Sequence, residues 1–160
     1  MNSKYILKSK NLSITVAEEL IEKMYLSAEA YYPNEFGGLL IGFYNKDNQN
    51  LVISDILLPN VFTSTPVFFE RKTDDLLEKL KEYYKSEPSK FYVGEWHSHP
   101  NGGTAPSARD IKAMMQIHND ENVAIEKPIL AILSYNNKTK NYKIQFHLII
   151  NNNTYTYEKN

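Results

Sequence analysis

The feature that most constrains this chain is a pair of histidines that alternates at the end of a short apolar run. The run Phe91-Tyr92-Val93 leads within a few residues to His97 and His99. In an extended strand, alternate side chains point to the same face. Both imidazoles therefore aim at one point, as metal ligands do, although two exposed or hydrogen-bonded histidines give the same pattern.

The residues that follow the pair can complete a metal site. A loop with two prolines and two glycines, residues 100–106, is stiff and turns sharply before it reaches Ser107 and Asp110. If this loop folds back, Asp110 joins His97 and His99. Two nitrogens and one carboxylate oxygen are the donor set of a catalytic zinc site, which keeps a fourth position open.

Ser107 and Asp110 also have an explanation that needs no metal. Ser-x-x-Asp at a helix start resembles a capping box, and a carboxylate in the first turn interacts favourably with the helix dipole. This explanation is compatible with a metal site, because the same turn projects from the loop after the histidines. The Ser107 hydroxyl can in addition donate a hydrogen bond to a developing oxyanion.

A zinc hydrolase also needs a base that takes a proton from the attacking water, and two glutamates compete for this role. Glu95 alternates with His97 and His99, so we expect it on their face of the strand. Glu35 lies far upstream, at the entrance to the apolar run 38–44. Spacing alone leaves this choice open.

The two other histidines, His118 and His147, lack a partner at metal-ligand spacing, and we interpret both as ordinary polar residues that are satisfied by hydrogen bonds. Other hydrolytic signatures are missing from the sequence. It contains no His-Glu-x-x-His, no Gly-x-Ser-x-Gly and no Pro-Cys-x-x-Cys. A small-molecule hydrolase or deaminase on a related fold is one alternative, and the missing Pro-Cys-x-x-Cys counts against deamination.

The pattern of apolar residues predicts a single α/β domain over residues 1–160, with a mixed sheet flanked by helices. Several neighbouring strands are separated only by short polar turns, which favours hairpins within that sheet. Thr15 and Glu18 match a capping box that opens the first helix. The expected helices span residues 15 to about 31, 74–86 and 107 onward. The expected strands lie at 4–11, 38–44, 51–58, 67–70, 90–97, 129–135, 142–150 and 154–158.

Composition limits the possible partners and compartment. The chain has 160 residues and a net charge of -1, so it lacks the basic balance that favours nucleic acid or an anionic membrane. No apolar run approaches the roughly 18 residues that span a bilayer. The N-terminus has no secretory h-region, which makes the cytoplasm the expected location. With no cysteine, disulfides and a thiol nucleophile are excluded.

These residues together resemble the signature of the JAB1/MPN/Mov34 metalloproteases, the JAMM group. The signature is Glu35, then His97-Ser98-His99-Pro100, then Ser107 and Asp110, and every position is filled. The Gly94-Glu95-Trp96 lead-in resembles the short prokaryotic JAB proteins. The resemblance covers about residues 10–150, and it implies a mixed sheet flanked by helices that is similar to cytidine deaminases.

The resemblance also implies a role for each residue. Glu35 is the general acid/base, and Glu95 is left beside the metal centre or in contact with substrate. His97, His99 and Asp110 ligate one zinc ion per chain, and Ser107 supports the tetrahedral intermediate. Enzymes of the family cut isopeptide or peptide bonds after the C-terminal glycines of ubiquitin-like proteins, so the expected partner is such a protein or its conjugate.

The short bacterial members suggest a pathway. They resemble deconjugating partners of ubiquitin-like transfer systems in antiphage defence, where the conjugated target is a nucleotidyltransferase that makes cyclic nucleotides. Tail-processing proteases of sulfur-carrier pathways are similar and are the rival interpretation. A non-catalytic MPN scaffold is a further alternative, although such scaffolds usually lack part of the ligand set, and this chain has all of it.

Overall fold

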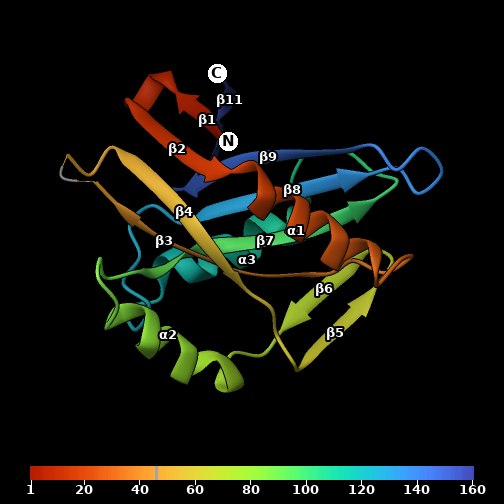
Figure 1. Cartoon of the computed structure of the whole chain (residues 1–160), viewed down its shortest axis with the longest axis horizontal. Helices are drawn as coiled ribbons and strands as arrows, with labels where there is room; N and C mark the ends of the chain where they lie inside the picture. The colour runs from red at the N-terminus through yellow and green to blue at the C-terminus, as the bar shows by residue number, and fades with distance from the viewer. Residues whose placement is uncertain (46) are drawn as a thin grey trace.

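The computed structural model describes residues 1–45 and 47–160, and it is built around one nine-stranded sheet (Figure 1). The strand order is β10-β9-β8-β7-β3-β4-β2-β1-β11. The pairs β2–β4 and β7–β8 are parallel, whereas the other neighbours are antiparallel. In the described part of the chain, every helix is too short or too polar to cross a membrane.

The elements follow one another with short connections. The strands are β1 (Asn2–Leu7), β2 (Leu12–Ala17), β3 (Gly37–Tyr44), β4 (Asn50–Leu57), β5 (Phe62–Thr65), β6 (Phe68–Arg71), β7 (Phe91–Pro100), β8 (Ile129–Tyr135), β9 (Tyr142–Ile150), β10 (Asn153–Thr156) and β11 (Glu158–Lys159). The α-helices are α1 (Glu18–Glu29), α2 (Leu77–Tyr84) and α3 (Ala108–Asn119), with short 3-10 helices η1 (Lys8–Lys10) and η2 (Asp74–Leu76).

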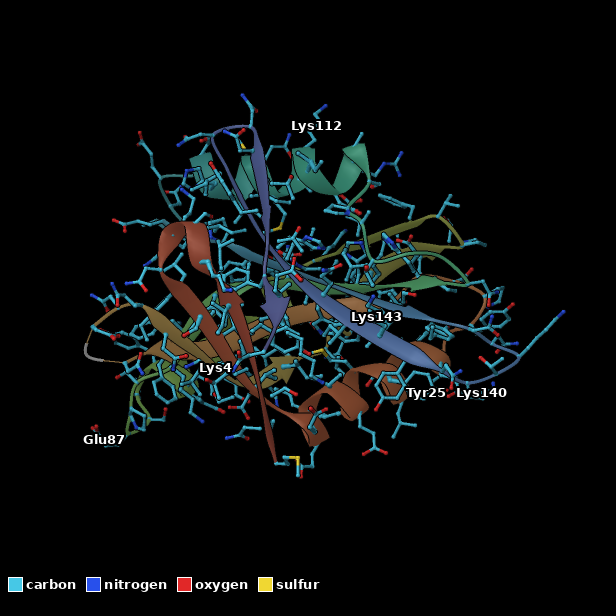
Figure 2. The ribbon with its side chains drawn as sticks, turned by 90° about the horizontal axis from the view of Figure 1, so that it is seen from above. Lys4, Tyr25, Glu87, Lys112, Lys140 and Lys143 are labelled. Atoms are coloured by element: carbon cyan, nitrogen blue, oxygen red, sulfur yellow. The ribbon has the colours of Figure 1, made fainter. Side chains whose placement is uncertain are left out.

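Helices cover the sheet on both faces, as the alternating side chains of β8 show. Ala131 packs in the apolar cluster that contains Met24 of α1. Its neighbour Leu130 packs in a different cluster with Met114 of α3. Figure 2 shows α3, which carries Lys112, on one side of the sheet and α1 on the other. The apolar run of β8 therefore has no solvent-facing side, as expected of a central strand.

The helix α2 lies on the same face as α3. Leu39 of β3 packs against Leu76 at the start of this helical segment. Leu39 is also directly opposite Glu95 of β7, which is in turn opposite Leu130 of β8. Directly paired residues in neighbouring strands share a face. Glu95 and the alternating residues after it on β7 therefore face α2 and α3.

A β-bulge in β7 adjusts this alternation. Consecutive residues of β3 pair with Gly94 and with Tyr92, which leaves Val93 as the extra residue. Gly94 has a φ of 155°, and a Cβ at this position would lie 1.9 Å from the carbonyl oxygen of Ile129. Only glycine fits such a close approach. The bulge turns the Tyr92 side chain to the same face as Glu95, whose carboxylate it contacts.

The strands β5 and β6 form a separate two-stranded sheet beside the main one (Figure 1). The aromatic rings of this hairpin attach it to the core. The ring centroids of Phe62 and Phe69 lie 5.2 and 5.7 Å from that of Phe36, which is buried directly before β3. Edge-to-face contacts of this kind stabilise the packing beyond the area that they bury.

The predicted mixed sheet is confirmed, together with its hairpins β3–β4 and β8–β9. The predicted capping box of Thr15 and Glu18 is wrong. Thr15 lies inside β2, opposite Val52 of β4, and α1 begins after Ala17, whose methyl group cannot cap a helix. The Thr-x-x-Glu spacing also fits a strand that runs directly into a helix, and here the parallel pairing with β4 decides the outcome.

We predict that Phe146→Ala in β9 destabilises the fold by about 3–5 kcal/mol, the usual cost of emptying a buried aromatic site. Phe146 is fully buried, and its ring contacts Tyr5 of β1 at 4.8 Å, so it joins distant strands of the sheet. Urea denaturation provides the measurement. Phe91→Ala is the matched control, because Phe91 is also in a strand but 47% exposed, and its expected cost is below about 1 kcal/mol. Equal losses would contradict this account of the core.

Candidate metal centre

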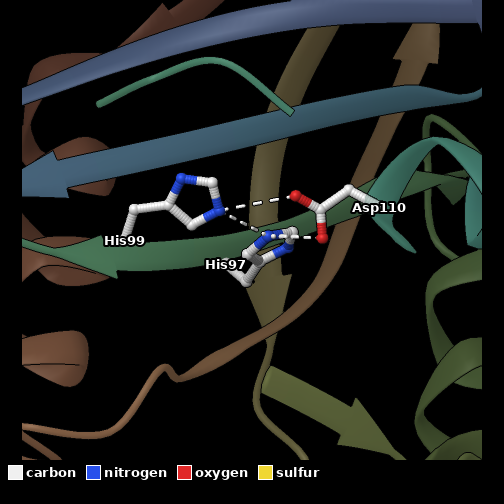
Figure 3. Close-up of side chains that lie close together, drawn as sticks. All are labelled: His97, His99 and Asp110. Carbon is white, nitrogen blue, oxygen red and sulfur yellow. Dashed lines mark hydrogen bonds and ion pairs between the residues drawn. The ribbon is translucent and has the colours of Figure 1, made fainter. Parts of the chain in front are cut away.

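The predicted histidine pair lies in the second half of β7, between β3 and β8. His97 is opposite Gly37 on one side and Ile132 on the other, and His99 is opposite Ser134. Both side chains point to the face that α3 covers, and their Nε2 atoms are 3.2 Å apart (Figure 3). The alternation predicted from the sequence is therefore confirmed.

Gly37 allows β3 to pass this closely. A Cβ at Gly37 would lie 2.0 Å from the carbonyl oxygen of Trp96 and 2.7 Å from the Cβ of His97. Any side chain here would displace the backbone of β7. The glycine before the apolar run of β3 is thus required by the position of the first histidine.

Asp110 reaches the histidines from the first turn of α3. One carboxylate oxygen, Oδ1, is 3.2 Å from His97 Nε2, and Oδ2 is 3.4 Å from His99 Nε2 (Figure 3). The capping box is also present. The Ser107 hydroxyl accepts a hydrogen bond of 3.1 Å from the Asp110 N–H, and the Ser107 N–H donates to Asp110 Oδ2 at 2.8 Å. The cap is thus observed, and it is compatible with the metal-site prediction, because it orients the carboxylate toward the imidazoles.

The spacing of these atoms fits a tetrahedral metal ion. Ligand atoms about 2.0–2.1 Å from a tetrahedral centre lie about 3.3 Å from one another. The two histidine nitrogens are 3.2 Å apart, and each lies 3.2 or 3.4 Å from a different one of the two Asp110 carboxylate oxygens. The residues His97, His99 and Asp110 therefore form a group that can hold a metal ion.

The hydrogen bond of the other His99 nitrogen, Nδ1, determines that Nε2 has the free lone pair that a metal ion needs. His99 Nδ1 lies 3.0 Å from the carbonyl oxygen of Gly103. A carbonyl only accepts hydrogen bonds, so Nδ1 carries the proton and donates it. In the neutral form of the ring, this leaves Nε2 unprotonated and facing the cluster, as in a metal-bound histidine.

The charges of the cluster also favour a cation. Burial raises the pKa of the Asp110 carboxyl, but hydrogen bonds from His97 and His99 outweigh burial and hold that pKa well below its usual range. Burial lowers the pKa of His99, yet the Asp110 hydrogen bond and the Gly103 carbonyl raise it overall. Surroundings that keep a carboxylate ionised and raise the pKa of the neighbouring imidazole have a negative potential, which also attracts a metal cation.

Glu35 lies next to the three candidate ligands. Its side chain is 10% exposed, and Oε1 is 3.9 Å from His99 Nε2. Burial raises the pKa of the Glu35 carboxyl, and the nearby positive charge of His97 and His99 partly opposes this shift. A carboxyl group with a raised pKa beside a metal site is suited to accept and return protons.

The β5–β6 hairpin holds the Glu35 backbone. The Glu35 N–H donates to the carbonyl oxygen of Thr65 at 2.9 Å, and the Ser64 hydroxyl donates to the carbonyl oxygen of Glu35. The next residue is held by β7. The Phe36 N–H donates to the hydroxyl of the fully buried Ser98 at 3.0 Å, and the Ser98 N–H donates back to the Phe36 carbonyl at 2.8 Å.

Glu95, the competing glutamate, has other partners. Its carboxylate forms an ion pair with Arg71 of β6 and accepts a hydrogen bond of 3.0 Å from the Tyr92 hydroxyl. Burial and the Glu95 charge raise the pKa of Tyr92, which keeps this hydroxyl protonated. The ion pair of Glu95 with Arg71 thus connects the β5–β6 hairpin to the main sheet.

A cleft of about 700 Å³ runs from the cluster between β6 and α3. Glu35, His97 and Asp110 are among the residues that line it, and so are the consecutive residues 67–71. The guanidinium group of Arg109 lies over the Phe68 ring at 4.4 Å and joins the two walls. Sequence reasoning did not identify Arg71 or Arg109, because their importance depends on how the hairpin docks.

The two other histidines make hydrogen bonds, as interpreted from the sequence. His118 Nδ1 is 3.3 Å from the carbonyl oxygen of Ile125. His147 Nε2 lies 2.8 Å from the carbonyl oxygen of Thr104, and its Nδ1 lies 3.0 Å from the Thr156 hydroxyl.

Comparison with known proteins agrees with this geometry. Residues 17–154 match the family described as prokaryotic homologs of the JAB domain. A CD-NTase/cGAS isopeptidase of Enterobacter hormaechei is 30% identical over 122 residues, which are 76% of this chain and 67% of that protein. One of Escherichia coli is 30% identical over 118 residues, or 71% of this chain and 73% of that protein. A probable metalloprotease of Sinorhizobium fredii is 23% identical over 75% of this chain and 74% of its own length.

The fold has a counterpart among solved structures. A protein of Desulfitobacterium hafniense, determined in solution, superposes with a TM-score of 0.67 at 22% identity and covers 91% of this chain and 90% of its own. That similarity concerns the fold alone. The family match over residues 17–154, together with the identity to the two isopeptidases, shows that this chain belongs to the prokaryotic JAB domain family.

Proposed function

We propose that this chain, acting as one domain over residues 1–160, is a zinc-dependent isopeptidase that cleaves after the C-terminal glycine of a ubiquitin-like protein or its conjugate. The observation that carries the proposal is the convergence of His97, His99 and Asp110 beside the buried Glu35 in the lining of a cleft. Membership of the JAB family and the isopeptidase and metalloprotease names of its relatives support it.

One zinc ion per chain would be held by His97, His99 and Asp110. This donor set of two imidazoles and a carboxylate is typical of catalytic zinc, and it leaves room for water or substrate. When bound, zinc supplies Lewis acidity that activates a water molecule and polarises the substrate carbonyl. The neighbouring histidines hold the pKa of Asp110 low, so little free energy is needed to provide its ionised carboxylate as a ligand.

Glu35 would move the protons. Its carboxylate accepts a proton from the attacking water and returns it to the leaving amine, which is the amine of a lysine side chain in an isopeptide. Burial raises the Glu35 pKa toward the range in which both steps are feasible. The Glu35 backbone is held at its N–H and at its carbonyl by the hairpin, which limits how far the carboxylate can move.

Ser107 would stabilise the negative charge that develops on the substrate oxygen. Its hydroxyl oxygen already accepts a hydrogen bond from the Asp110 N–H. A hydroxyl group that accepts one hydrogen bond still has its own proton to donate. That proton is available to the oxyanion, so one serine both caps α3 and assists the reaction.

The cleft suits an extended tail. Five consecutive residues of the hairpin, 67–71, line it, although alternate side chains of a strand point to opposite faces. The edge of β6 therefore faces the cleft with its backbone groups. A glycine-rich C-terminal tail can add to such an edge as a further strand, and glycines fit where the walls are close.

The names of two relatives suggest the conjugated target. Both are called CD-NTase/cGAS isopeptidases, and we extend this substrate to the present chain. It would then release a nucleotidyltransferase from a ubiquitin-like protein in a bacterial defence system. A tail-processing protease of a sulfur-carrier pathway would instead cut a linear peptide bond. Parallel assays on an isopeptide conjugate and on a linear fusion separate these two activities.

We predict that wild-type protein binds about one zinc ion per chain and that removal by a chelator abolishes cleavage until zinc is restored. His97→Ala and Asp110→Ala should lose the ion, because two remaining ligands bind zinc weakly. Elemental analysis and thermal unfolding with and without zinc provide the measurements. His118→Ala is the matched control and should retain the metal. Zinc-free wild type after loading would refute the proposed site.

We predict that Glu35→Gln retains zinc but lowers the cleavage rate by about 10²–10⁴-fold, the usual contribution of a general base. Glu95→Gln tests the competing glutamate. It should lose less than about tenfold, because glutamine keeps an acceptor for Arg71 and Tyr92. Single-turnover cleavage of a ubiquitin-like fusion measures both. The assignment would be reversed by a Glu95→Gln protein that is inactive beside an active Glu35→Gln protein.

The two roles of Ser107 are separable. Ser107→Gly should cost only a few tenths of a kcal/mol in stability, because glycine is tolerated at the N-cap, and the backbone N–H that binds Asp110 is kept. The oxyanion contact is lost, so kcat should fall by about 10²-fold or more. Ser107→Thr keeps a hydroxyl and should recover most of the activity. Full activity in Ser107→Gly would leave the serine as a helix cap alone.

A further inference from the structure

The loop between the histidines and α3 is attached to three adjacent strands by its backbone carbonyls. Three consecutive residues each accept a hydrogen bond at this group. The Ser134 hydroxyl of β8 donates to Gly102 at 2.7 Å, and His99 Nδ1 of β7 donates to Gly103 at 3.0 Å. His147 Nε2 of β9 lies 2.8 Å from the carbonyl of Thr104.

His147 is built into the sheet for this contact. The residue is buried, with 2% of its surface exposed, and β9 places it opposite Leu130 of β8 and Thr156 of β10. The Thr104 carbonyl can only accept, so His147 Nε2 donates, and the unprotonated Nδ1 accepts from the Thr156 hydroxyl at 3.0 Å. Burial lowers the pKa of His147, which agrees with a neutral ring that carries one proton.

A second residue of β9 holds the same loop position. The Thr104 hydroxyl donates to the side-chain oxygen of Gln145 at 2.8 Å. Gln145 and His147 are two residues apart and therefore share a face of the strand. Thr104 is thus fixed at its side chain and at its carbonyl, while Gly102 and Gly103 before it are exposed and have no side chain of their own to pack.

We infer that His147 is a positioning residue of the metal centre. By holding the Thr104 carbonyl, it fixes the adjacent Gly103 carbonyl, which receives the Nδ1 proton of His99 and so keeps His99 Nε2 free and correctly oriented for the metal. The connection runs from Thr156 through His147 and the loop to His99. Partners outside the ligand set of a metal site commonly orient the ligating imidazoles in this way.

The effect of His147 should exceed that of an ordinary buried hydrogen bond. The peptide groups on either side of Gly103 gain rotational freedom if the Thr104 carbonyl is released, because glycine restricts the backbone least. The Gly103 carbonyl can then turn away from His99. The His99 ring loses both its orientation and its preferred proton position, and metal affinity falls even though all three ligands are still present.

The test is zinc affinity, measured by competition with a chromophoric chelator, and it rests on the metal site proposed above. We expect His147→Leu to weaken zinc binding about 10–100-fold, the usual effect of removing such a partner. His147→Gln carries an amide N–H near the position of Nε2 and should restore affinity to within a few-fold of wild type. His118→Leu is the matched control, because His118 also bonds a backbone carbonyl but is remote from the loop, and it should bind zinc as wild type does.

Thr156→Val provides a second variant in case His147→Leu folds poorly. It removes the donor to His147 Nδ1 while the ring itself stays, and affinity should fall by up to about tenfold. Thermal unfolding of the metal-free variants is measured beside the zinc affinity. If His147 has only a structural role, the variants have a lower melting temperature but the same zinc affinity as wild type. That result in both His147→Leu and Thr156→Val would overturn the inference. If wild type itself fails to bind zinc, the proposed metal site is wrong and this inference falls with it.

Discussion

The backbone pairing of β3 with β7 is the constraint on which the rest of the site depends. At Gly37 the two strands approach so closely that even a methyl group would overlap the Trp96 carbonyl. The contact between the two segments continues beyond the first residue of β3, where Phe36 and Ser98 exchange two hydrogen bonds. Because Glu35 comes directly before Phe36, its carboxylate is brought to the ligand side of β7. One register thus positions the first histidine and the proposed base together.

The β5–β6 hairpin connects that base to the wall of the cleft. It contacts the main sheet through the Phe36 aromatic cluster and through the ion pair of Arg71 with Glu95, whose side chains are 21% and 17% exposed. A charged pair with so little contact with water is costly to break, because either partner alone would keep a buried charge. The same hairpin supports the Glu35 backbone at Thr65. A tail that binds along β6 would therefore press on the element that holds the base.

The sequence predicted the features of the site that follow from local residue spacing. It left open those that follow from how distant segments pack against one another. The common face of His97 and His99 follows from strand alternation, and the capping box of Ser107 and Asp110 follows from its own spacing. The choice between Glu35 and Glu95 did not, because it requires the path of the β3 entrance and the ion pair to Arg71. Only the family resemblance favoured Glu35 before the fold was known.

The role of His147 was hidden for the same reason, since its contact is made to a backbone carbonyl 43 residues away. A carbonyl leaves no trace in the sequence, so a lone histidine in a strand gives no signal of its own. The parallel pairing of β2 with β4 is likewise a contact between distant segments, and it places Thr15 in a strand and not at the predicted helix cap.

Hydrogen bonds within the fold orient two of the three proposed ligands. Asp110 Oδ2 is held by the Ser107 N–H and His99 Nδ1 by the Gly103 carbonyl, so each of these ligands is oriented by a second contact. The conformational entropy of ordering these side chains is lost during folding and not again on binding. Such preorganisation needs a rigid connection between β7 and α3. The loop of Gly102, Gly103 and Thr104 provides this rigid connection through its hydrogen bonds to the sheet. Its two exposed glycines alone would make the loop flexible.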